Sequence, residues 1–304
     1  MAFAFHRGEQ AMQARAGVEL PRQFRFVRDA MPDEHRELFA QLPYIVAGAV
    51  DPEGRPFASM LVGAAGFAST PDAHTLVIEA SPAAGDPIAA GLRVEAPVGV
   101  LGIQLETRRR NRANGVIASV TPDRITVAIR ESFGNCPQYI QTRAPLSVVR
   151  RDAKAPQQLT TQLPARALAI VCAADTLFIA SAHGDDVDVS HRGGRPGFVR
   201  GSDDGSTLVL PDFSGNDFFM TLGNLHEDPR AGIAFVDFAS GALLSLTGTT
   251  EIVWDGPELA SFAGAERLVR FRVTRGTLLE GAIPFTWSAP GFARQLVRTG
   301  SWGG

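Results

Sequence analysis

Six segments of the first half of this chain recur in the same order in its second half. The run TLVI at residues 75–78 returns as TLVL at 207–210, and ANGVIASV at 113–120 returns as LTGTTEIV at 246–253. The other four matches join 44–51 to 176–182, 54–60 to 194–200, 85–92 to 215–222 and 96–105 to 228–238. Ordered matches at a nearly constant offset indicate an internal duplication. The chain is therefore predicted to contain two copies of one unit.

The repeated segments are short apolar runs separated by turn residues. Runs such as 75–80, 98–105 and 124–130 are typical of β-strands, and 31 glycines and 20 prolines supply turns. Strands of about five residues with a turn signal every ~8–12 residues favour a barrel over a sandwich. We predict a mainly β fold with short helices (α+β). The predicted parts are an N-terminal helical extension (1–35), a first unit (36–150), a linker (151–164) and a second unit (165–304).

Two short helices are predicted in the N-terminal part. Residues 8–18 form one candidate, and residues 33–42 form another, with apolar side chains at helical spacing. Asp33 stands where an N-cap is expected.

Composition excludes several classes of protein. A net charge of -3 and a pI near 6.1 give no general attraction to nucleic acid or anionic membranes. Two cysteines do not make a disulfide framework, and no apolar run is long enough to be a signal peptide core or a membrane span. We expect a soluble, cytoplasmic protein with neither nucleic acid nor membrane as partner.

Four segments of the second unit form an ordered motif set. They are an arginine-bounded segment from Arg195 to Arg200, TLVLPDFSGNDFF at 207–219, NLHEDPRAGIAFVDF at 224–238 and LSLTGTTEI at 244–252. This set resembles the pyridoxamine 5'-phosphate oxidase-like family of FMN-binding split β-barrels. With FHRGEQAMQARAGV at the start and ESFGNCPQYIQ at 131–141, the whole chain is similar to the tandem-duplicated bacterial branch of that family. The resemblance implies two split barrels packed as a pseudo-dimer.

The same resemblance implies that FMN is the cofactor and that it lies in the cleft between the barrels. Arginine suits a phosphate because its planar fork donates two hydrogen bonds at once, and a glycine lets the backbone approach a ring. A helix starting near Asp217 would add free N–H groups. The predicted cofactor-binding residues are Arg192, Arg195, Pro196, Gly197, Phe198, Val199, Arg200, Ser214, Gly215, Asn216, Asn135 and Gln138.

The first unit looks degenerate at the matching places. On the repeat as read from sequence, Arg55 matches Arg195, Met60 replaces Arg200 and Asp86 replaces Asn216. An aspartate repels a phosphate, so we predict one FMN per chain, in the second unit. The first unit would then supply the opposite wall from residues 106–115 and 133–141. In that wall Tyr139 is a further flavin contact, and Arg109, Arg110 and Arg112 are candidates for binding phosphate or an anionic substrate.

Several residues keep two interpretations. The run 108–112 is either a ligand contact or a solvated hairpin, and Cys136 is either a redox thiol or a bystander. His191 is either a proton donor beside the flavin or a turn-stabilising histidine. Cys172, Phe218, Phe219 and Leu222 read as core residues. His183, Asp185, Asp186, Asp188 and His191 match no standard ligand spacing, and we predict no metal.

Function follows from the resemblance at the level of the family. We predict an FMN-dependent oxidoreductase that acts on an unknown small molecule or on oxygen, with a non-catalytic flavin or haem carrier as the alternative. Trp287 and Arg294 do not stand in the arrangement that vitamin B6 oxidases use, so vitamin B6 is not expected to be the substrate. No nicotinamide-binding fingerprint is present, which leaves a separate reductase as one source of electrons. No catalytic residue is assigned, and a monomeric pseudo-dimer and a homodimer both stay open.

Overall fold

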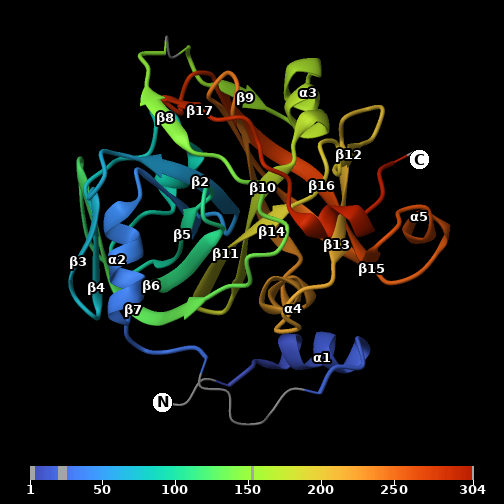
Figure 1. Ribbon diagram of the computed structural model, residues 1–304, viewed down its shortest axis with the longest axis horizontal. Coiled ribbons are helices and arrows are strands. Elements are labelled where there is room, and N and C mark those ends of the chain that lie inside the picture. The colour runs from blue at the N-terminus through green and yellow to red at the C-terminus, as the bar shows by residue number, and fades with distance from the viewer. Residues whose placement is uncertain (1–3, 20–25, 152–153, 303–304) are drawn as a thin grey trace.

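Two antiparallel sheets dominate the protein, one from each half of the chain (Figure 1). The structure is a computed structural model that describes residues 4–19, 26–151 and 154–302. The strands of the first sheet are β1 (Tyr44–Val50), β2 (Pro56–Val62), β3 (Ala68–Asp72), β4 (Thr75–Ile78), β5 (Pro97–Gln104), β6 (Arg109–Thr121) and β7 (Arg124–Gly134). Those of the second are β10 (Thr176–His183), β11 (Asp186–Gly193), β12 (Arg200–Gly201), β13 (Thr207–Phe213), β14 (Arg230–Asp237), β15 (Ala242–Val253) and β16 (Ala265–Leu279), with β9 (Gln157–Leu159) added beside β16.

The two sheets have the same strand order. The first runs β2-β1-β5-β6-β7-β4-β3 and the second runs β11-β10-β14-β15-β16-β13-β12, so each of these strands has a counterpart in the other unit, and β9 lies outside the correspondence. A small third sheet pairs β8 (Pro145–Val148) with β17 (Phe285–Trp287) and ties the connection between the units to the C-terminal segment. The duplication and the predicted fold class, two tandem split-barrel units in a mainly β chain, are confirmed.

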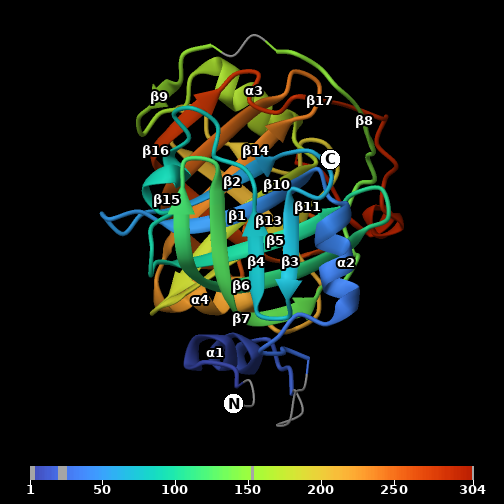
Figure 2. The same cartoon turned by 90° about the vertical axis from the view of Figure 1, so that its left-hand side faces the viewer.

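Short helices decorate the sheets. They are α1 (Arg7–Arg15), α2 (Asp33–Gln41), α3 (Ala165–Ala173), α4 (Met220–Glu227), α5 (Pro257–Ala260) and the 3-10 helices η1 (Pro87–Ala90) and η2 (Arg294–Arg298). Figure 2 shows α2 beside β3 and β4 of the first unit, with α1 below the sheets. Both predicted N-terminal helices form, although Pro32 rather than Asp33 takes the N-cap position. Cys172 was wrongly predicted to be a core residue, because α3 buries Ala167, Ile170 and Val171 and leaves this thiol exposed.

The units meet through a reciprocal contact between glycines and strand backbone. A Cβ on Gly99 of β5 would lie 2.6 Å from the carbonyl oxygen of Val187 in β11. The counterpart Gly232 of β14 has the same relation to β2, since its Cβ would lie 2.6 Å from the carbonyl oxygen of Pro56. Only glycine permits such an approach. Each unit therefore presents the same surface to the other, as expected for a pseudo-dimer within one chain.

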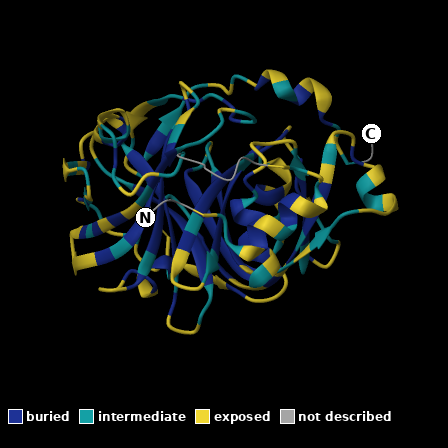
Figure 3. Ribbon diagram, turned by 90° about the horizontal axis from the view of Figure 1, so that it is seen from below, coloured by how far each residue is buried: buried dark blue, intermediate teal, exposed yellow. Residues whose placement is uncertain are grey.

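Apolar side chains form one core inside each unit and another between the units. The core of the second unit includes Phe235 and Phe271, and that of the first includes Phe39 and Ile117. The core between the units joins Tyr44 and other first-unit residues to second-unit residues such as Phe178. Figure 3 shows the buried residues concentrated in the strands at the middle of the molecule. No helix among the described residues is both long enough and apolar enough to cross a membrane.

Strand registers correct the way the repeat was aligned from sequence. Met60 pairs with Val46 in the first unit as His191 pairs with Phe178 in the second, so Met60 corresponds to His191 and not to Arg200. The segment 194–200 is matched instead by 63–69. In both segments a Cβ on the first glycine, Gly63 or Gly194, would strike the phenylalanine four residues later. Asp86 is the N-cap of η1 and corresponds to Phe219 at the N-cap of α4, not to Asn216.

Candidate functional site

A cleft of about 900 Å³, including its open mouth, lies between the two units. The first unit contributes Arg110, Arg112, Asn135, Cys136, Gln138 and Tyr139. The second contributes the end of β11 (190–193), the segment from the end of β13 into α4 (211–222) and Arg267 of β16. Both first-unit segments that were predicted to form the opposite wall, 106–115 and 133–141, contribute residues to this cleft.

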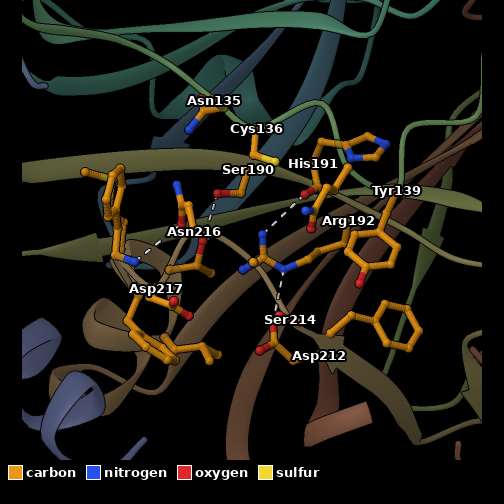
Figure 4. A pocket seen from close by; sticks show the side chains of 18 of the residues that line it. Asn135, Cys136, Tyr139, Ser190, His191, Arg192, Asp212, Ser214, Asn216 and Asp217 are labelled. Carbon is orange, nitrogen blue, oxygen red and sulfur yellow. Dashed lines mark hydrogen bonds and ion pairs between the residues drawn. The ribbon is translucent and has the colours of Figure 1, made fainter. Parts of the chain in front are cut away.

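Strand β11 brings Ser190 and Arg192 to the second-unit side of the cleft. Two residues apart on one strand, they lie on the same face of the sheet. The Ser190 hydroxyl lies 2.8 Å from the hydroxyl of Thr221 in α4. The Arg192 Nε lies 3.6 Å from a carboxylate oxygen of Asp212, and its Nη1 donates to the carbonyl of His191 (Figure 4).

A second arginine shares Asp212 with Arg192. The Nε of Arg267 donates to the other Asp212 oxygen at 3.0 Å, and its guanidinium lies 4.8 Å from the ring centre of Phe219. Arg267 also pairs with Glu266. One carboxylate, that of Asp212, thus serves two guanidinium groups at the floor of the cleft.

Arg110 of β6 faces these residues from the first unit. Its Nε donates to the carbonyl of Cys136 at 2.8 Å, and its Nη1 lies 3.4 Å from both Nδ1 and the carbonyl oxygen of His191. All of these partners are neutral, and among the described residues no carboxylate forms an ion pair with this guanidinium. Arg112, two residues on, is paired with Asp188 at 3.0 Å.

The crowded guanidinium groups change one another's pKa. Burial, followed by repulsion from Arg112 and Arg192, lowers the pKa of Arg110 to about 9. Burial and the neighbouring cations Arg112 and Arg267 also lower the pKa of Arg192, against the attraction of Asp212. The pKa of His191 falls well below its usual range because of burial and of Arg110 and Arg192, so this ring is neutral at pH 7. An anion in the cleft would relieve this repulsion.

Three buried polar atoms around the cleft lack a hydrogen-bond partner. They are Nε2 of His191, Oδ1 of Asn135 and Nε of Arg112. Because Nδ1 of His191 faces a guanidinium donor, the proton of the neutral ring belongs on Nε2. Buried polar atoms are normally paired, so a ligand with acceptors and donors fits this cleft.

An aromatic pair and an exposed loop form the mouth of the cleft. Tyr139, whose φ of 59° is in the left-handed region, stacks on Phe213 with ring centres 5.0 Å apart. The loop 214–217 is exposed, and Oδ1 of Asn216 accepts a hydrogen bond from the N–H of Phe218. The helix α4 begins at Met220, three residues later than predicted, because Asp217 and Phe219 adopt left-handed backbone conformations.

Residues 163–280, most of the second unit, match the family model described as pyridoxamine 5'-phosphate oxidase. The second unit belongs to the pyridoxamine 5'-phosphate oxidase-like family. No curated protein matches the chain.

Part of the chain is also similar to several solved structures. HupZ of Group A Streptococcus is 15% identical, with a TM-score of 0.31, over 38% of this chain and 91% of that one. A Clostridium acetobutylicum protein related to general stress protein 26, of the pyridoxinephosphate oxidase family, is 14% identical, with a TM-score of 0.28, over 38% and 85%. The FAD binding protein of Mycobacterium smegmatis is 11% identical, with a TM-score of 0.28, over 41% and 98%. At these scores the matches carry no argument about ligand or activity.

The structure brings half of the predicted cofactor residues to the cleft. Six of them line it. The second unit supplies Arg192, Ser214, Gly215 and Asn216, and the first unit supplies Asn135 and Gln138. The other six lie outside the cleft: Arg195, Pro196, Gly197, Phe198, Val199 and Arg200. Residues 195–199 form a turn with Gly197 at a φ of 81°, not the predicted strand, because β11 already ends at Gly193, and Arg200 begins the two-residue strand β12.

The side chains of the segment 195–200 have other partners. Phe198 and Val199 are buried in the core of the second unit. Arg195 donates to the carbonyls of Leu296 and Thr299 in the C-terminal segment, at 2.8 and 3.0 Å. Arg200 pairs with Glu258, and its guanidinium lies 4.2 Å from the ring centre of Trp302. These two arginines therefore hold the C-terminal part of the chain.

Some other cleft residues were predicted with a different role, and some were not predicted at all. Arg110 and Arg112, predicted as candidates for an anion, line the cleft, whereas Arg109 points to the carbonyl of Glu34. Phe218, Phe219 and Leu222 combine core packing with a place in the cleft wall. Arg267, Asp212 and Thr221 were missed. The sequence signal for Arg267 is a lone arginine at a core-facing position of the strand pattern AERLVRF, which by itself predicts nothing about a ligand.

Proposed function

We propose that the cleft between the units binds FMN and that the protein is an FMN-dependent oxidoreductase. The observation that carries the proposal is the positive charge of Arg110, Arg192 and Arg267 around one cleft, with Asp212 as the carboxylate that the last two share. Asp212 and the Arg267–Glu266 pair offset part of this charge, and Arg110 has no carboxylate partner among the described residues, so an anionic phosphate would compensate the charge that is left. Membership of the second unit in the pyridoxamine 5'-phosphate oxidase-like family supports a flavin as the molecule that carries this phosphate.

The proposed contacts divide between the two walls. On the second-unit side, Arg192 and the loop residues Ser214, Gly215 and Asn216 would hold the phosphate. On the first-unit side, Arg110 would add charge, and the amides of Asn135 and Gln138 would hydrogen-bond polar groups of the flavin. The residues of the segment 195–200 have no part in this proposal.

A bound flavin would supply hydride and electron transfer, while the protein binds and orients it. The guanidinium groups favour any ligand form with negative charge, and neutral His191 offers its Nε2–H as a hydrogen-bond donor at every pH near neutrality. The stacked pair of Tyr139 and Phe213 restricts the mouth and limits the access of water. A small-molecule substrate or oxygen would enter there, and electrons would come from a separate reductase or from a nicotinamide cofactor that binds transiently.

A carrier without catalytic activity is the second candidate, for flavin or for haem. Haem is the poorer ligand for such a carrier, because the proton on Nε2 of His191 leaves no lone pair there for iron. The absorption spectrum of the purified protein distinguishes the two ligands, since flavin is yellow and haem has a Soret band.

Titration of cofactor-free protein with FMN and with riboflavin tests the proposal. The two ligands differ only in the phosphate, so FMN should bind at least about 10-fold more tightly, the value of one charge-assisted hydrogen bond. Equal binding of the two, or no binding of either, would overturn the proposed site. Bleaching of the bound flavin by NADH or NADPH, alone or with an added flavin reductase, would separate an enzyme from a carrier.

A further inference from the structure

A second pocket lies next to the cleft and has the opposite charge. Its volume is about 1080 Å³, including the open mouth, and Met220 of α4 lines both spaces. The N-terminal segment supplies His6 and Glu9, and the first unit supplies Asn114 and Glu131. The second unit supplies His183, Asp186, Asp188 and Asn224, and Ala4, Val27, Arg28, Asp29 and Arg130 complete the wall.

The interior of this pocket contains more carboxylates than cations. Glu9 is only 4% exposed, and Asp188 and Glu131 are partly buried beside it. Arg112 neutralises Asp188, which leaves Glu9 and Glu131 without a guanidinium partner among the described residues. At the exposed rim, Arg28 and Arg130 are balanced by Asp29 and Asp186.

His6 does not supply the missing positive charge. His6 accepts from the N–H of Gly8 on Nδ1 and faces Oδ1 of Asn224 with Nε2 at 3.0 Å, an arrangement of a neutral ring. Burial and the nearby His183, which stacks on it with ring centres 4.1 Å apart, lower its pKa. Glu9 and Glu131 instead retain protons, which offset the negative charge that a cation would otherwise balance. Burial and the neighbouring carboxylates raise the pKa of Glu9 to about 8 and that of Glu131 to about 7.

An independent feature points to a ligand with N–H groups. Asn114 is 7% exposed, its amide nitrogen donates to Asp188 at 2.6 Å, and its Oδ1 has no hydrogen-bond partner. An unpaired buried acceptor beside two carboxyl groups suits a donor that is also positively charged. Met220, Val27 and Ala4 add apolar surface for a short hydrocarbon chain.

We propose that this second pocket is a binding site for a small organic cation, an alkylammonium ion whose nitrogen lies among Glu9, Glu131 and Asn114. A metal ion is a poorer occupant. No group of three or more His, Cys, Asp or Glu side chains in the described part of the chain is placed to hold one. The site shares none of the residues proposed to hold the FMN phosphate, so it stands or falls independently of the proposed function.

Calorimetric titration of the full-length protein with n-butylammonium chloride tests this inference. Binding should saturate and should release protons, because the ammonium ion replaces the protons of Glu9 and Glu131. The measured heat should therefore vary with the ionisation enthalpy of the buffer. 1-Butanol, which lacks the charge, and magnesium chloride should show no saturable binding. Equal binding of butanol, saturation by magnesium in place of the amine, or no saturation with butylammonium would overturn the proposal.

Variants locate the binding. The double substitution Glu9→Gln with Glu131→Gln keeps the size of both side chains and should weaken butylammonium at least about 10-fold, the value of one hydrogen bond to a charged group. Glu53→Gln, at an exposed glutamate of the first unit, should bind as the unchanged protein does. Unchanged affinity in the double variant would contradict the assignment.

Crystallography keeps the test decisive if the double variant does not fold. Soaking crystals of the unchanged protein with 3-bromopropylammonium, in which ring closure with loss of bromide is slow, should place the anomalous signal of bromine in the pocket beside Met220. A bromine found only elsewhere, or none at all at saturating concentration, would overturn the site. Parallel titrations with and without FMN show whether either site fails on its own.

Discussion

The duplicated fold creates two equivalent positions between the units, and among the described residues only one of them holds a polar cleft. The Val98–Gly115 pair of the first unit corresponds to Ala231–Gly248 of the second, so Arg110 and Arg112 correspond to Leu243 and Ser245. By the same registers Arg192 corresponds to Leu61, His191 to Met60 and Asn135 to Leu279. Three guanidinium groups, an imidazole and an amide of the polar cleft thus correspond to three leucines, a serine and a methionine.

The leucine-lined counterpart is filled by the protein itself. Leu243, Leu279 and Met60 are buried in the core between the units, and Leu61 is buried in the core of the first unit. Each such side chain contributes about 1.5–3 kcal/mol by burial. The charged cleft lacks this stabilisation by apolar burial, and its arginine side chains repel one another. The comparison shows that both units have the same fold, but that only the cleft with Arg110 and Arg192 has the positive charge that an anionic ligand needs.

The strongest test of this difference between the two positions is the number of FMN molecules bound per chain. Saturated protein should contain one FMN per chain, because the counterpart cleft is packed and uncharged. Release of the flavin by heat, followed by its absorbance against protein concentration, gives the ratio. A ratio of two would show that the leucine-lined cleft also binds and would end the argument.

Exchanging a residue between the clefts should have the next largest effect. Arg192→Leu installs the residue of the counterpart and removes a charged donor, so FMN should bind about 10- to 100-fold more weakly. Fluorescence quenching during an FMN titration measures the change. Arg200→Met is the matched control and should leave affinity unchanged, since Arg200 is held by Glu258 outside the cleft. The opposite ranking of the two variants would restore the segment 195–200 as the site.

Removing Arg110 should also weaken FMN while it relaxes its neighbours. Arg110→Leu takes away one of the two cations that lower the pKa of His191, so that pKa should rise toward its usual value. NMR titration of the histidine ring signals follows this change, and FMN affinity should fall about 10-fold. A His191 pKa that does not move would contradict the electrostatic coupling across the cleft.

A pH effect distinguishes the units. In the first unit Ser59 bonds Asp86, whereas in the second its counterpart Ser190 faces the neutral Thr221. Burial raises the pKa of Asp86 to about 6 from 3.8, so the folded state holds this proton more tightly than the unfolded state does. The contribution of Asp86 to stability is therefore complete below about pH 4 and is lost as pH rises to about 6, by roughly 3 kcal/mol. Urea unfolding of the protein and of Asp86→Asn across this range should show the smaller pH dependence in the variant.

The smallest effect is expected at the mouth of the polar cleft. Tyr139→Ala removes the ring that stacks on Phe213, a contact worth about 0.5–1.5 kcal/mol. FMN affinity should fall by a few fold, while Tyr139→Phe should keep it. A loss as large as that of Arg192→Leu would make the tyrosine a principal contact rather than part of the mouth.

Local pattern was enough for the fold but not for the alignment of its halves. Strands such as 75–78 and 207–210 were predicted because apolar alternation and turns are local properties. The match of 54–60 to 194–200 rested on the shared letters Gly-Arg-Pro, yet in the first unit these letters lead into β2, whereas in the second unit they follow the end of β11. Hence the arginines at 195 and 200 were assigned to a strand that had already ended.

The sequence by itself determined that this chain is a duplicated β protein with arginines and a polar loop in its second unit. The tertiary structure alone decided which arginines meet. Arg110, Arg192 and Arg267 come from three strands far apart in the chain, and they face one cleft because the two units pack reciprocally through Gly99 and Gly232. Charge repulsion acts through space and not along the chain. Only the packing of the units shows that these cations are crowded together and that Leu243 and Leu61 stand in their place on the other side.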